Sequence, residues 1–333
     1  MRIVKPYAKE MYNSNPMAHI ESIGRVCYKS EDKITADSMK KFCESMYKSK
    51  HHAMLEHFIF IVRVPKNMYD IMRSIPNNRF MQFTANGNRN IISMSARSII
   101  DIEEMVEYMI ANGEQGYDYS QLVAIISIRR HIISHYQCPE IFGGELPLYN
   151  GNIVCMTRDE LVGTEEIMTH GWHSVLFTCD RGITHEFVRH RDASFAQEST
   201  RYCNYSNGKF GGEIAVIRPS YFEPGSELDE LWDKTCIYID AMYIQMIHAG
   251  ATAQQARAIL PNSTKTDIVI TARNNEWKHI VDLRYRGVTG APHPQMVEVM
   301  QVLVENHEWA HAMAHNAPVG VIGVEGRNMS SMR

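Results

Sequence analysis

Several features that mark common protein classes are missing from this sequence of 333 residues. Its seven cysteines are an odd number without C-x-x-C spacing, so we expect neither a disulfide framework nor a thiolate metal site, but a reducing compartment. No apolar run approaches the roughly eighteen residues of a membrane span, and the N-terminal residues do not resemble a signal peptide. We therefore expect a cytoplasmic protein without a membrane partner.

A strong excess of positive charge is also missing. The net charge is −4, whereas a domain that binds nucleic acid along its surface is normally strongly basic. We therefore expect no nucleic-acid partner, and any binding of anions must be local. The hydrophobic fraction of 44% and the charged fraction of 22% are ordinary for a globular protein with a sizeable core.

The densest group of basic residues lies in the segment DRGITHEFVRHRDASFAQESTRYCNY, residues 180–205, which we call the arginine segment. It contains Arg181, Arg189, Arg191 and Arg201, with His185 and His190 between them and Ser194, Ser199 and Thr200 close behind. Planar guanidinium groups bind phosphate or carboxylate through paired, charge-assisted hydrogen bonds, and a serine adds a neutral donor. The alternative is a solvated basic patch, because charged residues are mostly exposed.

One pattern within the arginine segment is more specific than a basic patch. Arg189-His190-Arg191 is followed, after seven residues, by Ser199, and the flanks read DRGITHEFVRHR and QESTRY. This pattern resembles the flavin-dependent thymidylate synthases (ThyX). Three further elements are similar to that family: H-x-x-x-x-E-H at 51–57, QQARAILP at 254–261 and NNEWKHIVDLR at 274–284. The resemblance covers roughly residues 51–64 and 173–300.

The resemblance implies roles for individual residues. It makes Arg284 the catalytic residue, whose guanidinium stabilises negative charge that develops on the uracil ring of dUMP. The residues expected to bind dUMP are Glu186, Arg189, Gln197, Ser199, Arg201, Arg257 and Arg284. Those expected to bind FAD are Ala53, Arg189, His190, Arg191, Arg273, Asn274, Asn275 and His279. His51 and Glu56 fall on the folate or NADPH side, and no residue is assigned to a metal.

Four positions depart from the family pattern. Arg273 and Asn275 stand where the family usually has Asn and Arg. Ala53 replaces a common Ser or Thr, and Ala196 replaces a common Asn. None of these changes removes a proposed catalytic arginine, but the flavin contacts at these positions are expected to have other partners.

The family resemblance also implies an activity and an architecture. The activity is the reductive methylation of dUMP to dTMP, with 5,10-methylenetetrahydrofolate as carbon donor, tetrahydrofolate as product, and FAD reduced by NADPH as the hydride source. The protein supplies binding and orientation, because the cofactor carries the redox chemistry. The implied fold is α+β, with a central antiparallel sheet flanked by helices. The implied assembly is a homotetramer with active sites built between subunits.

Periodicity gives a coarse map of the elements. Alternating apolar residues predict strands at 58–62, 175–179 and 212–218. Helical spacing predicts helices at 16–28, 38–47, 102–110, 121–136, 226–250, 252–260 and 295–314. The family has only a short connection where this chain has about a hundred residues. We therefore expect one catalytic domain, 1–333, with a helical inserted segment at 66–165.

Two other function classes stay open from the sequence. His307-Glu308-Trp309-Ala310-His311 is an HExxH pattern, in which histidines one turn apart can bind zinc while the glutamate acts as general base. The metzincin extension of this pattern is absent, and a helix face with packed or exposed histidines is the simpler interpretation. A non-catalytic module that binds nucleotide or RNA phosphates would use the arginines alone, but the acidic net charge disfavours it.

Cys203 resembles a nucleophile only superficially. The unrelated second family of thymidylate synthases attacks uracil with a cysteine, but the context RYCNY lacks that family's flanks and any obvious activating base. We expect Cys203 to be structural.

Overall fold

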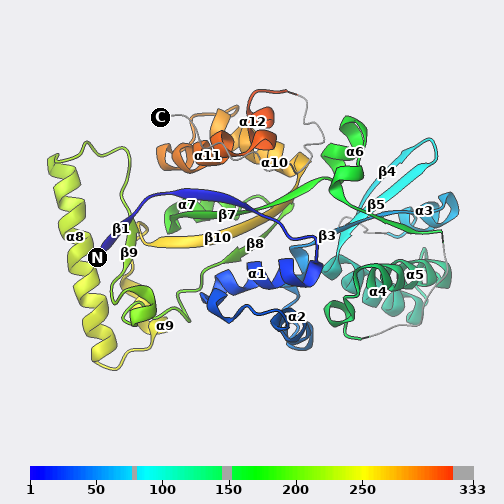
Figure 1. Ribbon diagram of the computed structural model, residues 1–333, viewed down its shortest axis with the longest axis horizontal. Helices are drawn as coiled ribbons and strands as arrows, with labels where there is room; N and C mark the ends of the chain where they lie inside the picture. Colours follow the sequence, from blue (N-terminus) through cyan, green and yellow to red (C-terminus); the bar gives the residue numbers. More distant parts are fainter. Residues whose placement is uncertain (77–80, 145–151, 318–333) are drawn as a thin grey trace.

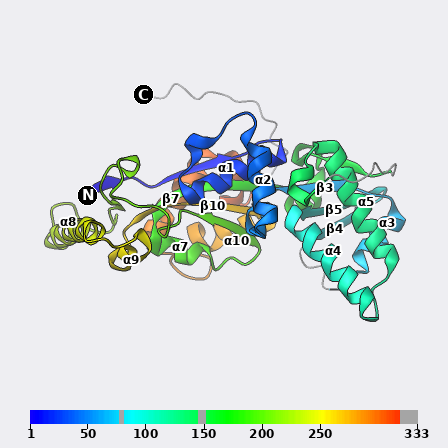
Figure 2. The same ribbon diagram turned by 90° about the horizontal axis from the view of Figure 1, so that it is seen from below.

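The computed structural model describes residues 1–76, 81–144 and 152–317. Two antiparallel sheets, each of four strands, lie side by side with helices packed against them (Figures 1 and 2). This confirms the predicted α+β fold with a central antiparallel sheet flanked by helices. In the part of the chain that is described, no helix is long and apolar enough to cross a membrane.

The central sheet positions the arginine segment. Its strand order is β2-β7-β10-β8, and every neighbouring pair is antiparallel. Along β10, Ile268 and Ile270 face one hydrophobic core and Val269 faces the other, as the two-residue period of a strand requires. The strands are β2 (Tyr7–Met11), β7 (Trp172–Asp180), β8 (Ala193–Gln197) and β10 (Lys265–Arg273).

Helices cover both faces of the central sheet. In Figure 1, α1 and α2 lie below the sheet, and α10, α11 and α12 lie above it. The side chain of Asn15 caps α1 by accepting from the backbone N–H of Met17 and Ala18, at 2.9 and 3.1 Å. These helices are α1 (Pro16–Tyr28), α2 (Ser38–Lys48), α7 (Arg181–Phe187), α10 (Asn274–Val281), α11 (Pro294–Asn306) and α12 (Glu308–Ala314), with a π-helical turn η7 (Asp282–Arg286) after α10.

The insertion, residues 66–165, contributes three strands to the second four-stranded sheet, whose order is β4-β5-β3-β6. The fourth strand, β3, precedes the insertion in the chain. Helices α4 and α5 contain the predicted helices at 102–110 and 121–136, but α3 and the strands β4, β5 and β6 were not predicted. Strand β5 reads RNIISMS and is buried on both faces, so it does not alternate. The strands are β3 (Ile59–Arg63), β4 (Gln82–Asn86), β5 (Arg89–Ser95) and β6 (Val154–Met156). The helices are α3 (Lys66–Arg73), α4 (Ala96–Ala111) and α5 (Tyr119–Tyr136). Helix α6 (Gly163–His170) then leads into β7.

Strands β1 and β9 and helices α8 and α9 lie at the end of the central sheet away from the insertion (Figure 1). Strand β1 (Arg2–Val4) pairs in parallel with β9 (Ala215–Ile217). The long helix α8 (Glu227–His248) is capped by Ser226, and the predicted capping box of Thr252 and Gln255 begins α9 (Ala253–Ala256). Short 3-10 turns are η1 (Glu31–Lys33), η2 (His52–Glu56), η3 (Pro139–Phe142), η4 (Arg158–Glu160), η5 (Gly208–Phe210) and η6 (Arg257–Ile259).

The single helix predicted over 295–314 is wrong in one respect. The chain breaks between α11 and α12 at His307, whose backbone is extended, with φ −134° and ψ 116°. The first histidine of the HExxH pattern therefore precedes a helix of seven residues instead of lying inside a long one.

Candidate active site

Strand register brings the arginine segment against α10. Ala193, at the start of β8, pairs with Ala272, next to the end of β10. The loop that carries Arg189, His190 and Arg191 therefore lies beside the first turn of α10, although nearly a hundred residues separate the two elements. At its other end, the loop is anchored by α7, whose N-cap Asp180 accepts from the backbone N–H of Ile183 at 2.8 Å.

A first cavity of about 1020 Å³ opens where these elements meet. Six of the predicted site residues line it: Glu186, Arg189, His190, Arg191, His279 and Arg284. The structure thus brings together residues from both the Arg-His-Arg pattern and the NNEWKHIVDLR element.

Arg284 is fixed within this cavity by three hydrogen bonds. Its Nη1 donates to Oε2 of Glu186 at 2.7 Å, its Nη2 to the carbonyl oxygen of Glu186 at 3.0 Å, and its Nε to Nε2 of His190 at 3.2 Å. A guanidinium has five N–H groups, so two remain for a ligand. Arg284 lies in the π-helical turn η7, a local irregularity that occurs frequently at functional sites.

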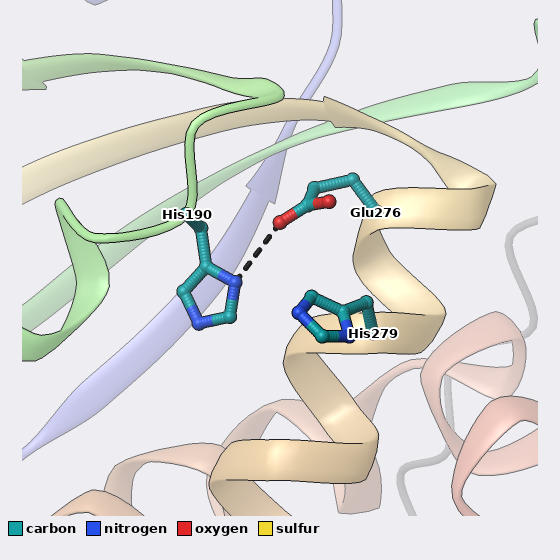
Figure 3. Close-up of side chains that lie close together, drawn as sticks. All are labelled: His190, Glu276 and His279. Atoms are coloured by element: carbon teal, nitrogen blue, oxygen red, sulfur yellow. Dashed lines mark hydrogen bonds and ion pairs between the residues drawn. The ribbon is translucent and has the colours of Figure 1, made fainter.

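His190 has a defined tautomer in this arrangement. Its Nε2 accepts from Arg284, so the proton of the neutral ring is on Nδ1, which donates to Oε1 of Glu276 at 2.9 Å (Figure 3). His279, one turn after Glu276 on α10, faces the same ring at a centroid distance of 5.4 Å. Together, Glu276, His190, Arg284 and Glu186 form what we call the Arg284 cluster.

Glu276 is a site residue that the sequence analysis missed. It lies inside the quoted element NNEWKHIVDLR, three residues before His279, so helical spacing places the two side chains on one face. The three-residue spacing from His279 could have indicated that Glu276 belongs to the site.

A second cavity of about 800 Å³ adjoins the first. Among the predicted site residues, Glu56, Arg191, Arg273 and Asn275 line it. Oε2 of Glu56 accepts from Oγ of Ser194 at 2.7 Å. The structure therefore joins the H-x-x-x-x-E-H element to the arginine segment.

Some predicted flavin residues have intramolecular partners. Arg273 donates to Oγ and the carbonyl oxygen of Ser93 at 3.3 and 3.2 Å, and burial lowers the pKa of Arg273 to about 10. Asn274 donates to the carbonyl oxygen of Ile167 at 2.9 Å. Ala53 packs against the hydrophobic core.

The two histidines of the H-x-x-x-x-E-H element, His51 and His57, differ in their surroundings. His51 is exposed, whereas His57 is fully buried and shares a hydrogen bond of 2.7 Å with Thr271. Burial lowers the pKa of His57 to about 3, so it is a neutral core histidine near neutral pH.

The rest of the predicted dUMP residues lie away from the first cavity. Gln197 donates to Thr184 and Thr266 at 3.1 and 3.3 Å. Arg201 donates to Gln254 of α9 at 3.1 Å, and Arg257 directly follows α9 and is exposed. Within one chain, the arginines of the predicted dUMP site thus form two groups, one at α10 and one at α9, which lie far apart in Figures 1 and 2.

Sequence comparisons agree with the geometry of the first cavity. Residues 159–307 match the model of the family described as "Thymidylate synthase complementing protein". The resemblance to the flavin-dependent thymidylate synthase family is confirmed. The match contains both halves of the first cavity, whereas the H-x-x-x-x-E-H element and most of the insertion lie outside it.

Individual curated proteins that match the chain carry the name of this family. The chain is 34% identical over 123 residues to the flavin-dependent thymidylate synthase of Pyrococcus furiosus, covering 37% of this chain and 50% of the relative. It is 37% identical over 136 residues to that of Pyrococcus horikoshii, covering 38% and 55%. The chain thus spans about half the length of these relatives. A crystal structure of the UMP/dUMP methylase PolB of Streptomyces cacaoi, bound with 5-Br UMP, aligns over 95% of both chains with 12% identity and a TM-score of 0.40.

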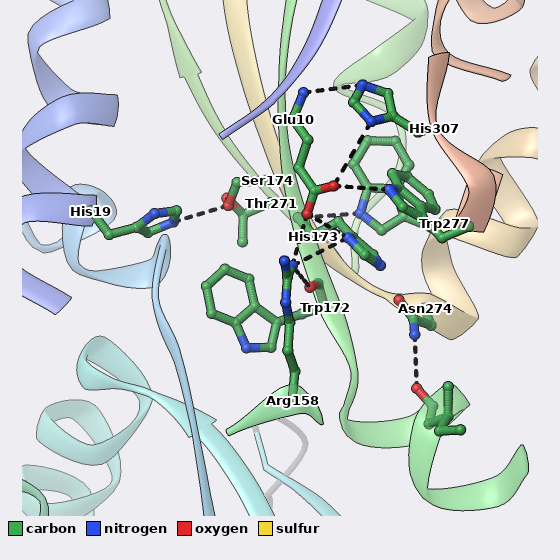
Figure 4. A network of polar contacts seen from close by, with 12 residues as sticks. Glu10, His19, Arg158, Trp172, His173, Ser174, Thr271, Asn274, Trp277 and His307 are labelled. Carbon is green, nitrogen blue, oxygen red and sulfur yellow. Dashed lines mark hydrogen bonds and ion pairs between the residues drawn. The ribbon is translucent and has the colours of Figure 1, made fainter. Parts of the chain in front are cut away.

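The HExxH residues have a different environment. The ring of His307 faces Glu10, whose backbone N–H donates to Nε2 at 3.3 Å, and His311 stacks on His315 at a centroid distance of 4.1 Å (Figure 4 shows His307 and Glu10). Among the described residues, the group whose ligand atoms come close enough for a metal is His190, Glu276 and His279, not the HExxH histidines. The geometry therefore disfavours a zinc site on α12.

Cys203 is buried, with 1% of its surface exposed, and burial raises the pKa of its thiol to about 12. A thiol with so high a pKa is protonated near neutral pH and is a poor nucleophile. This agrees with the structural role expected for it.

Proposed function

We propose that this protein is a flavin-dependent thymidylate synthase, which converts dUMP to dTMP by reductive methylation. The observation that carries the proposal is the meeting of Arg189-His190-Arg191 with Arg284 in the first cavity. The carbon donor is 5,10-methylenetetrahydrofolate, which leaves as tetrahydrofolate, and NADPH is the reductant. The names of the relatives, which specify both flavin and thymidylate synthesis, support this assignment.

The residues of the first cavity fit an anionic flavin and a nucleotide. Arg189 and Arg191 are exposed and line the cavity, and neither has an acidic ion-pair partner within the described ranges. Such guanidinium groups suit phosphate oxygens. FAD would be bound by Arg189, His190, Arg191 and His279 of the first cavity and by Asn275 of the adjoining second cavity, and it would supply the hydride after reduction by NADPH.

Arg284 acts on the uracil of dUMP. Its three hydrogen bonds to Glu186 and His190 fix the guanidinium before the substrate binds, and the two remaining N–H groups stabilise negative charge that develops on the ring. His190 positions Arg284, and Glu276 maintains the tautomer of His190 that can accept from it. Glu56 and His51 belong to the folate or NADPH side.

The assembly that fits this function is a homotetramer with active sites between subunits. Ser199, Arg201 and Arg257 would complete the nucleotide site of another subunit, since they lie apart from the first cavity of their own chain. The surface of α8 supports association, because Leu228, Leu231, Ile237 and Tyr238 are between 51% and 64% exposed. A cytoplasmic location suits the free, reduced cysteines and the nucleotide substrates.

The deciding experiment is the spectrum and turnover of the purified protein. We expect a bound flavin that absorbs blue light, NADPH oxidation that accelerates when dUMP is added, and formation of dTMP that persists after treatment with a zinc chelator. A colourless protein that added FAD cannot reconstitute would contradict the proposal. Activity lost together with stoichiometric zinc would revive the metallopeptidase, and nucleotide binding without any turnover would favour the phosphate-binding module.

A further inference from the structure

The inserted segment forms one wall of the second cavity. Gln82, Ser95, Arg97, Ser98 and Asp101 line that cavity from β4, β5 and α4. The opposite wall is the arginine segment, from Arg191 to Ser194, together with the end of β10. A ligand in the second cavity therefore contacts the insertion on one side and the arginine segment on the other.

Arg97 occupies an unusual place for a cation. It is the second residue of α4, in the first turn, where the positive end of the helix dipole disfavours positive charge. Its side chain is 41% exposed, and its guanidinium is held by two carboxylates. Its Nη1 donates to Oε1 of Glu56 at 2.5 Å, and its Nε donates to Oδ2 of Asp101 at 3.1 Å.

Glu56 connects Arg97 to the arginine segment. One carboxylate oxygen accepts from Arg97 and the other accepts from Ser194, at 2.5 and 2.7 Å. Ser194 lies three residues after Arg191 on β8. The chain of contacts Asp101–Arg97–Glu56–Ser194 therefore crosses from the insertion to the strand that follows the Arg-His-Arg pattern.

A second link fixes the insertion to the same edge of the central sheet. His170 of α6 shares hydrogen bonds with Thr84 of β4 at 2.9 Å and with Ser93 of β5 at 2.8 Å, and Ser93 accepts from Arg273. Arg273 is the position where the family usually has Asn. The guanidinium of Arg273 donates to Ser93 of β5, which belongs to the insertion. The residue that differs from the family pattern at this position therefore binds the insertion to the central sheet.

We propose that the insertion is a working part of the active site, in which Arg97 is a positioning residue for Glu56. The Arg97 guanidinium sets the direction of the Glu56 carboxylate, and through Ser194 it fixes the start of β8 behind Arg191. The folate carbon donor, the co-substrate other than dUMP, then lies on the side of the second cavity that the insertion forms, across from the flavin residues Arg191 and Asn275, and the insertion controls its binding. This inference rests on the proposed function and assigns a role within it to the part of the insertion that lines the second cavity, from β4, β5 and α4.

The test compares Arg97→Gln with Arg129→Gln. Arg129 also pairs with a carboxylate inside the insertion, Glu103, at 3.1 Å, but it lines neither cavity. For Arg97→Gln we expect the KM for methylenetetrahydrofolate to rise about tenfold, with flavin content and the KM for dUMP within about twofold of the parent, because one charge-assisted bond is lost on one side of the site. Arg97→Lys should recover part of this loss, and Arg129→Gln should leave all three quantities unchanged.

Each result has a distinct meaning. Unchanged folate kinetics in Arg97→Gln would overturn the inference and leave the proposed function standing. Equal losses in Arg97→Gln and Arg129→Gln, accompanied by equal falls in Tm, would show that Arg97 only stabilises the insertion, which also overturns it. A parent protein that binds flavin but forms no dTMP would overturn the proposed function, and this inference with it.

Discussion

Two clusters in this molecule use the same three residue types in different ways. The Arg284 cluster combines Glu276, His190 and Arg284, and a second cluster combines Glu10, His173 and Arg158 (Figures 3 and 4). In the second cluster, which we call the Glu10 cluster, Oε1 of Glu10 is 2.8 Å from both Nη1 of Arg158 and Nδ1 of His173. Hydrogen bonds alone therefore do not distinguish a reactive group from a structural one.

The difference lies in what surrounds each cluster. The ring of His173 stacks on Trp309 at a centroid distance of 4.0 Å, Trp309 donates to Oε2 of Glu10 at 3.1 Å, and the guanidinium of Arg158 lies 4.0 Å from the centroid of Tyr12. Aromatic rings thus close the Glu10 cluster. Arg284 and His190, in contrast, face a cavity of about 1020 Å³. The Arg284 cluster thus differs in two ways: it borders a cavity, and Arg284 keeps N–H groups that no other residue of the cluster accepts.

The largest effect is expected from removing the cation of the open cluster. Arg284→Ala should lower dUMP-dependent turnover roughly ten- to a hundredfold, since a lost charge-assisted hydrogen bond contributes about 1.5–3 kcal/mol. Flavin content and Tm should stay near the parent values. Arg284→Lys should recover little, because an ammonium group cannot reproduce the fork of a guanidinium. Steady-state kinetics with a parallel melting curve checks this, and normal turnover in the alanine variant would remove Arg284 from the active site.

The closed cluster should respond in stability instead. Burial alone would raise the pKa of Glu10, but the hydrogen bonds and charges of His173 and Arg158 outweigh it and lower the pKa to about 2 from the ordinary 4.5. Because the folded-state pKa is depressed, Glu10 stabilises the protein fully above pH 4.5, and this contribution is lost as the pH falls towards 2. Glu10→Gln should lower the free energy of unfolding at pH 7 by about 1.5 kcal/mol.

The pH dependence provides the control for Glu10. Denaturant unfolding at pH 7 and at a pH below 4 should show the gap between Glu10→Gln and the parent narrowing in acid. An unchanged or wider gap in acid would mean that the Glu10 carboxylate is not the source of the stabilisation. Turnover per folded molecule should be unaffected, which separates the closed cluster from the open one.

A smaller effect is expected from Glu276, which acts through His190. Glu276→Ala removes the acceptor for Nδ1 of His190 and should lower turnover by about two- to tenfold, less than the loss of a direct charge-assisted bond to the substrate, because Glu276 acts only through His190 and Arg284. Glu276→Gln retains an acceptor oxygen and should recover most of the loss. Lys278→Ala, on the same helix but paired with Asp282 at 2.5 Å, is the matched control. If Lys278→Ala and Glu276→Ala lose turnover equally, Glu276 only stabilises α10.

The sequence analysis named Glu186, His190 and Arg284 of the Arg284 cluster but not Glu276, and it named no residue pair of the Glu10 cluster, for a physical reason. The residues of the Arg284 cluster come from the arginine segment and from the NNEWKHIVDLR element. Both have recognisable patterns, so the family resemblance predicted that they share a site. The Glu10 cluster joins β2, η4, β7 and α12, and no local pattern indicates that Glu10 and Arg158 meet, because that contact depends on tertiary packing alone. Helical spacing predicted α1, α2, α4, α5 and α8, but of the central sheet the apolar period predicted only β7, and the antiparallel sheet itself was expected from the family resemblance. Strand β5, buried on both faces, has no alternation to detect.

The smallest effect is expected at Cys203, a buried group close in sequence to the predicted nucleotide residues. Its side chain packs in a core cluster with Tyr205 and Tyr243, and its backbone N–H, which a substitution keeps, donates to the carbonyl oxygen of Ser199 at 3.0 Å. Cys203→Ala should cost about 1 kcal/mol of stability through the small void it leaves. Since burial raises the thiol pKa to about 12, turnover should stay within about twofold of the parent. Loss of turnover in Cys203→Ala, or a covalent adduct of Cys203 with dUMP in a trapped complex, would show that burial does not separate structural from reactive groups here.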